Sequence, residues 1–500
     1  PVGGALLGLL GLLLARLRPR PLVDAVEANA LYGGRMSLRG SLIVCVQTLI
    51  SNGFGASVGL EAAYAQAGGG LASAIGRRLR IRRQDLRTLV GAGAGAAIGA
   101  AFGAPLTGAF YAFEVVIGFY APSMIAPVAA AALTAVLTAE ALGAATYSLH
   151  IEVIRSPGFA EFALYAGLGA ACAVFAMLLM KTVAQGDQLS RRLPAPAWLR
   201  PIIGGVLLAG MAMVTPHVLS SGHGALHLTL ASRWTLQFLA IVLILKTAAS
   251  VVSLTTGFRG GLFFASLLLG SLIGQIYARL LALTDLPIVL QPENAALVGM
   301  AALATGIVGG PLTMSFLILE ATRDFGVAAA ALAASLVTSS IVRERFGYSF
   351  STWRLHLRGE SIRSARDVSW IRSLTAGRMM RTGVPTIEAG SSLAEFRRRF
   401  PLGSAGRVIL IDEARRYSGI VPVAAAYADD LPAEAPLTGL VQSGGVFLTP
   451  EMNIKQVMQV FENLTRADTA RAAGLVQDLR DYFLIPHSHW VFVGAADLEQ

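Results

Sequence analysis

The sequence predicts an all-α polytopic membrane protein of two inverted-topology repeats with broken and re-entrant helices, followed by a small soluble α/β domain. Three observations support this prediction. Hydrophobic residues make up 54% of the 500 positions and charged residues only 14%, a balance typical of chains surrounded by lipid. Glycine and proline interrupt the apolar runs, and one stretch of the first half recurs in the second.

Apolar segments follow one another along the first 343 residues, at roughly 1–17, 39–60, 88–119, 122–143, 159–181, 201–219, 236–257, 261–283, 294–320 and 326–343. A simple membrane-spanning helix needs about 20 apolar residues in an unbroken run. Many of these segments instead contain glycine or proline, and irregular backbone is tolerated in a membrane only where it is buried in protein or lines a cavity. We therefore expect half-helices that end inside the membrane, as in secondary transporters.

An internal repeat is visible in the sequence itself. The stretch LVGAGAGAAIGAAFGAPLTGAFYAFE (89–114) matches LVGMAALATGIVGGPLTMSFLILE (297–320), with G-x-P-L-T and the closing Glu114 and Glu320 in register. Upstream, GLEAAYAQAGG (59–69) corresponds to GLFFASLLLG (261–270). Two halves related in this way predict a substrate site at their interface, near the middle of the bilayer.

The composition changes after Arg343, where the chain becomes polar and basic. We expect a membrane region over 1–355, a linker over 356–373 and a soluble domain over 374–500. Within the last region, RVILID (407–412) is typical of a buried strand and SLAEFRRRF (392–400) of a helix.

The formal net charge of +10 comes largely from arginines at the edges of apolar runs, such as 16–21 and 76–87. Anchoring at the cytoplasmic face explains them better than nucleic-acid binding, because no basic face with interleaved aromatic residues is present. Cys45 and Cys172 lie inside apolar runs without metal-ligand spacing, so neither a disulfide nor a metal site is expected. The chain is already apolar by residue 5, and we expect it to be a fragment that lacks its true start.

Four motifs make the chain resemble the CLC family of chloride channels and proton-coupled chloride exchangers over about residues 1–360. They are GLEAA (59–63), GAPLTGAFYAFEV (103–115), LKTAASVVSLTTGFRGGLFFAS (245–266) and SFSTWRLHLRG (349–359). The resemblance implies a multi-pass protein of an inner or plasma membrane that passes chloride, and a homodimer with one pathway in each subunit. It also implies a cytoplasmic C-terminal region similar to a pair of cystathionine-β-synthase (CBS) domains.

Chloride in a low-dielectric interior needs partial positive charge rather than a full countercharge, which would hold the ion too tightly. Helix N-termini meet this need, since their unpaired N–H groups and dipole attract an anion while remaining neutral. The two repeat-related helix starts supply the candidates, and the resemblance adds a hydroxyl from the last membrane helix: Gly59, Leu60, Glu61, Ala62, Gly261, Leu262, Phe263, Phe264 and Ser351.

Glu61 is the candidate gate. A carboxylate costs roughly 3 kcal/mol inside a membrane on insertion scales and is a functional candidate by default. Ionised, it can occupy the amide cradle of the chloride; protonated or displaced, it leaves the cradle to the ion. The resemblance assigns the gate to this position. A Glu61 that only stabilises its helix start is the alternative.

Three departures from the family pattern affect the expected mechanism. The serine position of the family's glycine-serine-glycine-isoleucine-proline turn falls near Arg18, with the proline at Pro21, so no central hydroxyl is available there. The expected tyrosine falls on Ser351, whose side chain is short. Exchangers carry a second glutamate after the one that matches Glu114, and here that residue is Val115.

Since valine cannot relay a proton, these residues favour a gated passive chloride channel over a proton-coupled exchanger, which remains the alternative. A polytopic membrane enzyme with Glu61, Glu114 or Glu320 as general acid or base is a weaker alternative, because no nucleophile–base pair or metal spacing accompanies these carboxylates. Glu114 and Glu320 are interpreted as structural, bound to nearby backbone. His217 and His223 are expected at a membrane edge.

The C-terminal region follows the order of a first CBS copy over 374–421, and 437–464 opens a second copy that is incomplete or divergent. Nucleotide-binding copies place a Ser or Thr and then an acidic residue after the last strand, whereas Pro422 and Ala425 stand here. We therefore expect no nucleotide and no other cofactor to bind.

Overall fold

The computed structural model divides into two compact units, Pro1–Asp367 and Val368–Gln500. It describes residues 1–17, 22–144, 146–147, 155–192, 194–231, 234–284, 287–347, 349–350, 352–353, 375–379, 384–414, 416–428 and 431–441, with 449, 452 and 456–457. The boundary between the units falls inside the expected linker 356–373, which lies outside the described residues.

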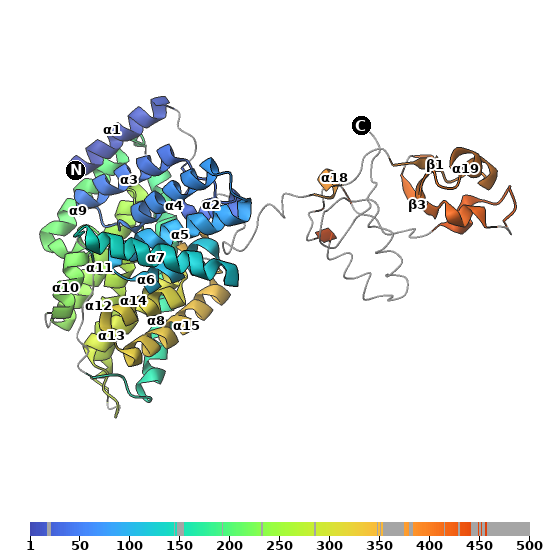
Figure 1. Ribbon diagram of the computed structural model, residues 1–500. Coiled ribbons are helices and arrows are strands. Elements are labelled where there is room, and N and C mark those ends of the chain that lie inside the picture. Colours follow the sequence, from blue (N-terminus) through green and yellow to red (C-terminus); the bar gives the residue numbers. More distant parts are fainter. Residues whose placement is uncertain are drawn as a thin grey trace. The chain divides into compact units, whose positions relative to one another are not determined.

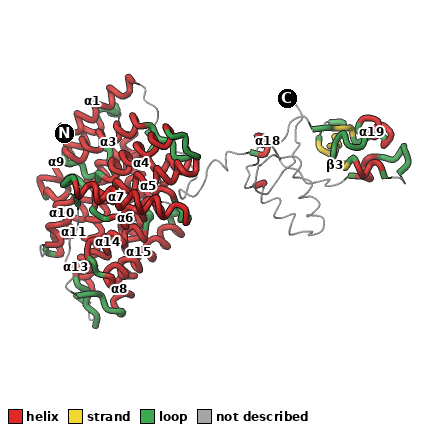
Figure 2. The backbone as a smooth tube through the Cα atoms, in the orientation of Figure 1, coloured by secondary structure: helices red, strands yellow, loops and turns green. Residues whose placement is uncertain are grey.

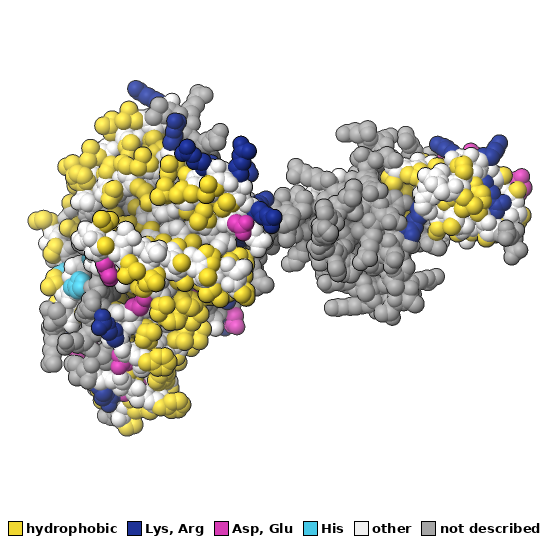
Figure 3. Space-filling view, viewed as in Figure 1, with side chains coloured by type: hydrophobic (Ala, Val, Ile, Leu, Met, Phe, Trp, Pro, Cys, Tyr) yellow, Lys and Arg dark blue, Asp and Glu magenta, His cyan; other side chains and the backbone are white. Residues whose placement is uncertain are grey.

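The described elements of the first unit are helices (Figures 1 and 2). Five of them are long and apolar enough to cross a membrane: α7 (Pro122–Ala141), α8 (Glu161–Arg192), α11 (Leu236–Thr256), α12 (Phe263–Leu281) and α15 (Phe325–Arg345). Hydrophobic side chains cover much of the visible surface of this unit (Figure 3). The expected polytopic membrane fold is therefore present.

Other helices, shorter or less apolar, complete the unit: α1 (Val2–Leu17), α2 (Ala25–Leu31), α3 (Leu38–Gly53), α4 (Glu61–Arg78), α5 (Arg83–Phe102), α6 (Pro105–Tyr111), α9 (Arg200–Val214), α10 (His223–Ala231), α13 (Pro292–Val308) and α14 (Pro311–Thr322). A π-helix, η1 (Ala112–Ile117), follows α6, and a 3-10 turn, η2 (Pro216–Val218), follows α9. Hydropathy alone did not predict α4, because glycine, alanine and polar residues dominate it.

The repeat is broken at the same place in both halves. Gly103 ends α5 with φ 65° and Gly309 ends α13 with φ 93°, a left-handed conformation that glycine adopts without steric cost. Pro105 and Pro311 then occupy the first turn of α6 and α14, where a missing N–H costs nothing. Each long apolar run of the repeat is therefore two helices.

Two carboxylates tie the halves together reciprocally. Glu114 of η1 accepts from the backbone N–H groups of Leu312 and Thr313 at 3.1 and 2.8 Å, and from the Thr313 hydroxyl at 2.7 Å. Glu320 of α14 accepts the equivalent three bonds from the start of α6, at 2.7, 2.9 and 2.6 Å. Each carboxylate thus satisfies orphan N–H groups of the other half, in agreement with the structural interpretation of both residues.

The second unit contains a three-stranded sheet in the order β1–β2–β3. β1 (Thr386–Glu388) runs parallel to β2 (Arg407–Ile411), and β3 (Tyr417–Pro422) runs antiparallel to β2. The helix α19 (Leu393–Arg399) starts at the N-cap Ser392. The strand and helix predicted at 407–412 and 392–400 are therefore confirmed, whereas most of the second predicted copy lies outside the described residues.

Candidate functional site

The loops that precede α4 and α12 meet in the first unit. The N–H of Gly59 donates to the carbonyl of Gly261 at 2.9 Å, and the N–H of Gly261 donates to the carbonyl of Gly59 at 3.2 Å. The two glycines are equivalent in the repeat, so the antiparallel bridge is what a pseudo-two-fold relation between the halves produces. Both predicted helix starts, Gly59 to Ala62 and Gly261 to Phe264, therefore lie together.

Glu61 is the first residue of α4, and its side chain crosses to the other half. The residue is only 4% exposed, and its Oε1 accepts a hydrogen bond from the N–H of Phe264. Its Oε2 is buried and makes no hydrogen bond to the described part of the chain. A side chain at Gly59 would collide with this carboxylate, so the glycine is required for the position that Glu61 takes.

The carboxylate lies at the N-terminus of α12, which begins at Phe263. The first N–H groups of a helix have no intrahelical partner, and the dipole adds about half a positive charge there. A helix N-terminus is a general anion site for this reason. In this structure the group held there is the Glu61 carboxylate, which accepts from the Phe264 N–H.

Lys246 of α11 is a buried basic residue near the site. Its side chain is fully buried, and its Nζ donates to the carbonyls of Val218 and Ser220 at 3.1 and 2.7 Å. Lys246 and Glu61 interact electrostatically. In the sequence this lysine is recognisable only as part of a motif, because the carbonyls that it contacts come from a separate segment.

An aromatic group covers the Phe264 side of the site. The ring of His223 lies against that of Phe264, with centroids 3.5 Å apart, and against Tyr147, with centroids 3.8 Å apart. His223 was expected at a membrane edge, and the structure shows a half-buried ring packed on a residue of the site. Local sequence could not indicate this, because Phe264 belongs to a different helix.

A cavity of about 150 Å³ reaches Glu61. Its wall includes Tyr111 and Val115 from the first half and Phe263 from the second. Other parts of the wall are Leu22, Val23, Asp24, Ala25, Val26, Glu27, Val44, Thr48, Ala62, Ala65, Gln66, Arg259, Gly260, Gly261, Leu262, Ile307, Val308 and Phe350. The position that departs from the exchanger pattern, Val115, therefore shares a cavity with the gate candidate.

Three residues of the sequence analysis lie outside the described residues: Arg18, Pro21 and Ser351. Phe350, which precedes Ser351 in the sequence, lines the cavity. Within the described part of the chain, no group of three or more His, Cys, Asp or Glu side chains could hold a metal ion.

The fold and this site define an integral membrane protein in which paired helix starts from two repeated halves surround a buried carboxylate. Residues 3–343 match the family model described as voltage gated chloride channel. The chain belongs to this family, the CLC family.

The chain is 30% identical over 314 residues to a ClcB-like chloride channel protein of Ralstonia nicotianae, covering 61% of this chain and 72% of the relative. It is 27% identical over 335 residues to the voltage-gated ClC-type chloride channel ClcB of Escherichia coli, covering 65% and 78%.

Solved structures share the fold. A slow cyanobacterial Cl⁻/H⁺ antiporter aligns with a TM-score of 0.64 at 21% identity, covering 71% of this chain and 86% of its own. A eukaryotic CLC transporter aligns with a TM-score of 0.60 at 19% identity, covering 93% and 85%. A CLC-type fluoride/proton antiporter aligns with a TM-score of 0.55 at 22% identity, covering 62% and 76%.

Proposed function

We propose that the chain passes chloride across a membrane and that Glu61 is the gate of its pathway. The observation that carries this proposal is the hydrogen bond from the Phe264 N–H to the Glu61 carboxylate at the N-terminus of α12. Chloride and an ionised carboxylate compete for the same donors. The family membership and the names of the relatives support chloride as the ion.

Protonation opens the gate in this proposal. The neutral carboxyl loses its attraction to the helix end and to Lys246, and one of its oxygens becomes a donor rather than an acceptor. The unbonded Oε2 of Glu61 is the atom at which a proton can be taken up without breaking a hydrogen bond. Anion flux should consequently rise as the external pH falls.

Val115 supports passive conduction. It lines the cavity that reaches Glu61, and its side chain cannot accept a proton from the gate. A chloride ion can then move through the site without a proton moving in the opposite direction. The pathway operates as a gated channel, with Leu60 to Ala62 and Leu262 to Phe264 as backbone donors. Gly59 and Gly261, which the sequence also offered as donors, use their N–H groups on each other's carbonyls instead.

Proton-coupled exchange is the second candidate, and a specific observation favours it. Asp24 and Glu27 line the same cavity as Glu61, so carboxylates other than one at position 115 are present along its wall. They could take over the proton relay that Val115 cannot perform. The fold is also that of solved Cl⁻/H⁺ and fluoride/proton antiporters.

We extend the proposal to the oligomeric state and to the second unit of the chain. A homodimer with one pathway in each subunit, embedded in the lipid bilayer, follows from the family membership. The unit from Val368 onward is proposed as a cytoplasmic regulatory domain of the CBS type that binds no nucleotide, since Pro422 ends β3 and Ala425 follows in a 3-10 turn. An enzymatic role is set aside, because the family consists of channels and transporters.

One measurement tests the proposal and separates its two forms. In proteoliposomes with a chloride gradient, a passive channel gives a reversal potential at the chloride equilibrium value, with or without a pH gradient. A coupled exchanger gives a potential that moves with the pH gradient, and its chloride gradient drives protons uphill. The lack of any anion flux would contradict both forms.

A further inference from the structure

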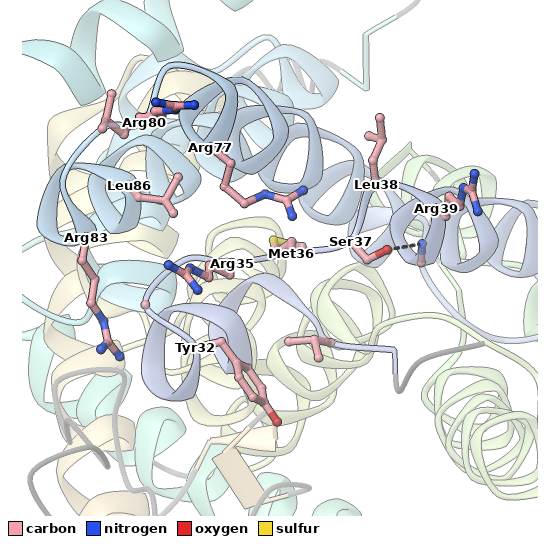
Figure 4. A pocket seen from close by; sticks show the side chains of 14 residues that line it. Tyr32, Arg35, Met36, Ser37, Leu38, Arg39, Arg77, Arg80, Arg83 and Leu86 are labelled. Carbon is pink, nitrogen blue, oxygen red and sulfur yellow. Dashed lines mark hydrogen bonds between the residues drawn. The ribbon is translucent and has the colours of Figure 1, made fainter. Parts of the chain in front are cut away.

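A large pocket lies at the α2–α3 and α4–α5 connections and shares the wall residue Val23 with the Glu61 cavity. Its volume is about 1050 Å³. Five arginines from three segments line it: Arg35, Arg39, Arg77, Arg80 and Arg83. Arg35 and Arg77 lie towards the middle of this group, and the other three lie at its edges (Figure 4). We call this the arginine pocket.

Buried hydrogen bonds fix the walls of the arginine pocket. The Ser73 hydroxyl donates to the carbonyl of Gly34 at 2.8 Å and accepts from the N–H of Met36 at 2.8 Å. The Nε of Arg77 donates to the carbonyl of Ser73 at 3.2 Å. The loop that carries Arg35 is therefore attached to the helix that carries Arg77, and the two cations are held on one framework.

The positive charge of the pocket is not neutralised by its own walls. Among the described residues that line the arginine pocket there is no Asp or Glu. The two ion pairs between described residues, Arg155–Glu161 and Arg191–Asp187, involve none of the five arginines. Like charges gathered around a concave surface repel one another and raise the local concentration of anions. The pocket therefore has the electrostatic character of an anion site.

Arg80 adds an independent observation. Its φ is +53°, and it follows the end of α4 in a turn closed by the bond from the Ile81 N–H to the Gly76 carbonyl at 3.1 Å. Glycine is the usual residue at this position of a helix end, because a side chain strains the left-handed conformation. Arginine here gives up backbone stability, and its side chain lines the pocket. Such strain accumulates at functional sites.

We propose that the arginine pocket binds a ligand with two or more phosphate groups. Guanidinium groups match phosphate oxygens with paired hydrogen bonds, and the volume exceeds what a single phosphate needs. The wall also contains Val23, Leu38 and Leu86, and Leu38 is 49% exposed. Apolar surface beside the arginines suits a phospholipid headgroup with its chains, and a soluble diphosphate offers the same phosphate chemistry.

General membrane anchoring is the competing explanation of these arginines. It requires positive charge near the membrane surface, but not its convergence on a pocket. The basic stretch offers a matched control, because Arg78 and Arg82 are exposed arginines outside the pocket wall. The double variants Arg35→Gln/Arg77→Gln and Arg78→Gln/Arg82→Gln remove the same charge from the same surface.

Native mass spectrometry of the full chain in neutral detergent tests the proposal, with diphosphatidylglycerol, inorganic pyrophosphate and zwitterionic phosphatidylcholine as probes. We expect the Arg35→Gln/Arg77→Gln protein to bind a diphosphate probe about tenfold more weakly, as expected when charge-assisted bonds are lost, and the control protein to keep the wild-type affinity. Preference for the lipid identifies a headgroup site, and preference for pyrophosphate identifies a soluble ligand.

The variant Arg80→Gly distinguishes a loss of binding from a loss of folding. This variant relieves the strained backbone, so its thermal stability should equal or exceed that of the wild type while its affinity for the diphosphate probe falls. Equal losses in the pocket and control variants, or no binding of either diphosphate probe above the level of phosphatidylcholine, would overturn the proposal. Unchanged affinity in Arg80→Gly would also contradict the role of this residue.

Discussion

The two halves of the membrane unit share a backbone plan but differ in the side chains placed on it. Both break a helix at a left-handed glycine, Gly103 or Gly309, and both use a carboxylate to satisfy the other half. At the equivalent helix starts, however, the first half carries Glu61 and the second carries Phe263. The repeat therefore builds two equivalent helix starts, and only the first half places a carboxylate at its start, the residue that we propose as the gate.

A second difference lies in the connections between paired helices. The α4–α5 connection is rich in arginine and lines the arginine pocket, whereas the equivalent connection between α12 and α13 is mostly apolar over the described residues. A third is the π-helix η1, which replaces regular α-helix in the first half only. Such π-helical turns are frequent at functional sites, and η1 carries Val115.

The largest expected effect comes from removing the asymmetric charge. Glu61→Gln should raise anion flux at neutral pH and abolish its pH response, because the charged acceptor of the Phe264 N–H is lost. A hydrogen bond to a charged group contributes about 1.5–3 kcal/mol, so the closed state should weaken by about tenfold or more. Chloride efflux from proteoliposomes at several external pH values measures this.

Glu320→Gln is the matched control for this charge removal, and it should keep the wild-type pH response. Glu61→Ala should resemble Glu61→Gln and leave room for a further ion. A Glu61 variant with the wild-type pH profile would refute the gate.

The two repeat-related carboxylates, Glu114 and Glu320, should contribute equally to the stability of the fold. Glu114→Ala and Glu320→Ala each remove an acceptor of three hydrogen bonds and leave two backbone N–H groups without it. Each should destabilise the fold by about 2 kcal/mol. Thermal unfolding in detergent should show similar decreases in Tm, whereas Glu140→Ala, on the exposed surface of α7, should change little. A large difference between the two capping variants would break the proposed symmetry.

A smaller effect is expected from the paired glycines. A methyl group at Gly59 would overlap the Glu61 carboxylate, whereas one at Gly261 would meet its nearest atoms only at 3.8 Å. Gly59→Ala should therefore push the gate out and raise flux at high pH, though less than Glu61→Gln does. Gly261→Ala should leave the pH profile unchanged. Identical effects of the two variants would show that the backbone bridge, rather than the gate, was disturbed.

The smallest effect is expected on proton movement, when a carboxylate is introduced at one of two equivalent positions of the repeat. Val115→Glu introduces a carboxylate into the cavity that contains Glu61, and a chloride gradient should then move some protons uphill. Ala321→Glu, the equivalent change in the second half, should not, because Ala321 does not line that cavity. Measurement of luminal pH in proteoliposomes distinguishes the two. Uphill proton movement by the unmodified chain would favour the exchanger and contradict the passive form.

Much of the fold was predictable because it depends on local properties. Hydropathy located helices such as α7, α11 and α15, and the G-x-P-L-T pattern located the breaks, since glycine and proline act on their own backbone. Hydropathy missed α4, because its small and polar residues look unlike a membrane segment until neighbouring helices enclose it. Only the repeat and the GLEAA motif indicated that a helix starts there. The strand Arg407–Ile411 was found from its short apolar run.

The candidate site was predictable as a set of helix starts but not as a set of contacts. The repeat indicated that Gly59 and Gly261 are equivalent, and the structure shows that their backbones are hydrogen-bonded to each other. Sequence gave no indication that His223 packs on Phe264, or that Lys246 satisfies three carbonyls of one loop. These partners lie on separate helices, so no local pattern relates them.

By itself, the sequence determined that this chain enters a membrane, that its two halves repeat and that Glu61 begins a helix, because hydropathy, internal similarity and glycine or proline chemistry are properties of neighbouring residues. Only the tertiary structure decided which amide receives the Glu61 carboxylate and which arginines share a pocket. Phe264 meets Glu61, and Arg35 and Arg77 come to line one pocket, through the packing of whole helices. That packing reflects the burial of many side chains together, and no short segment contains this information.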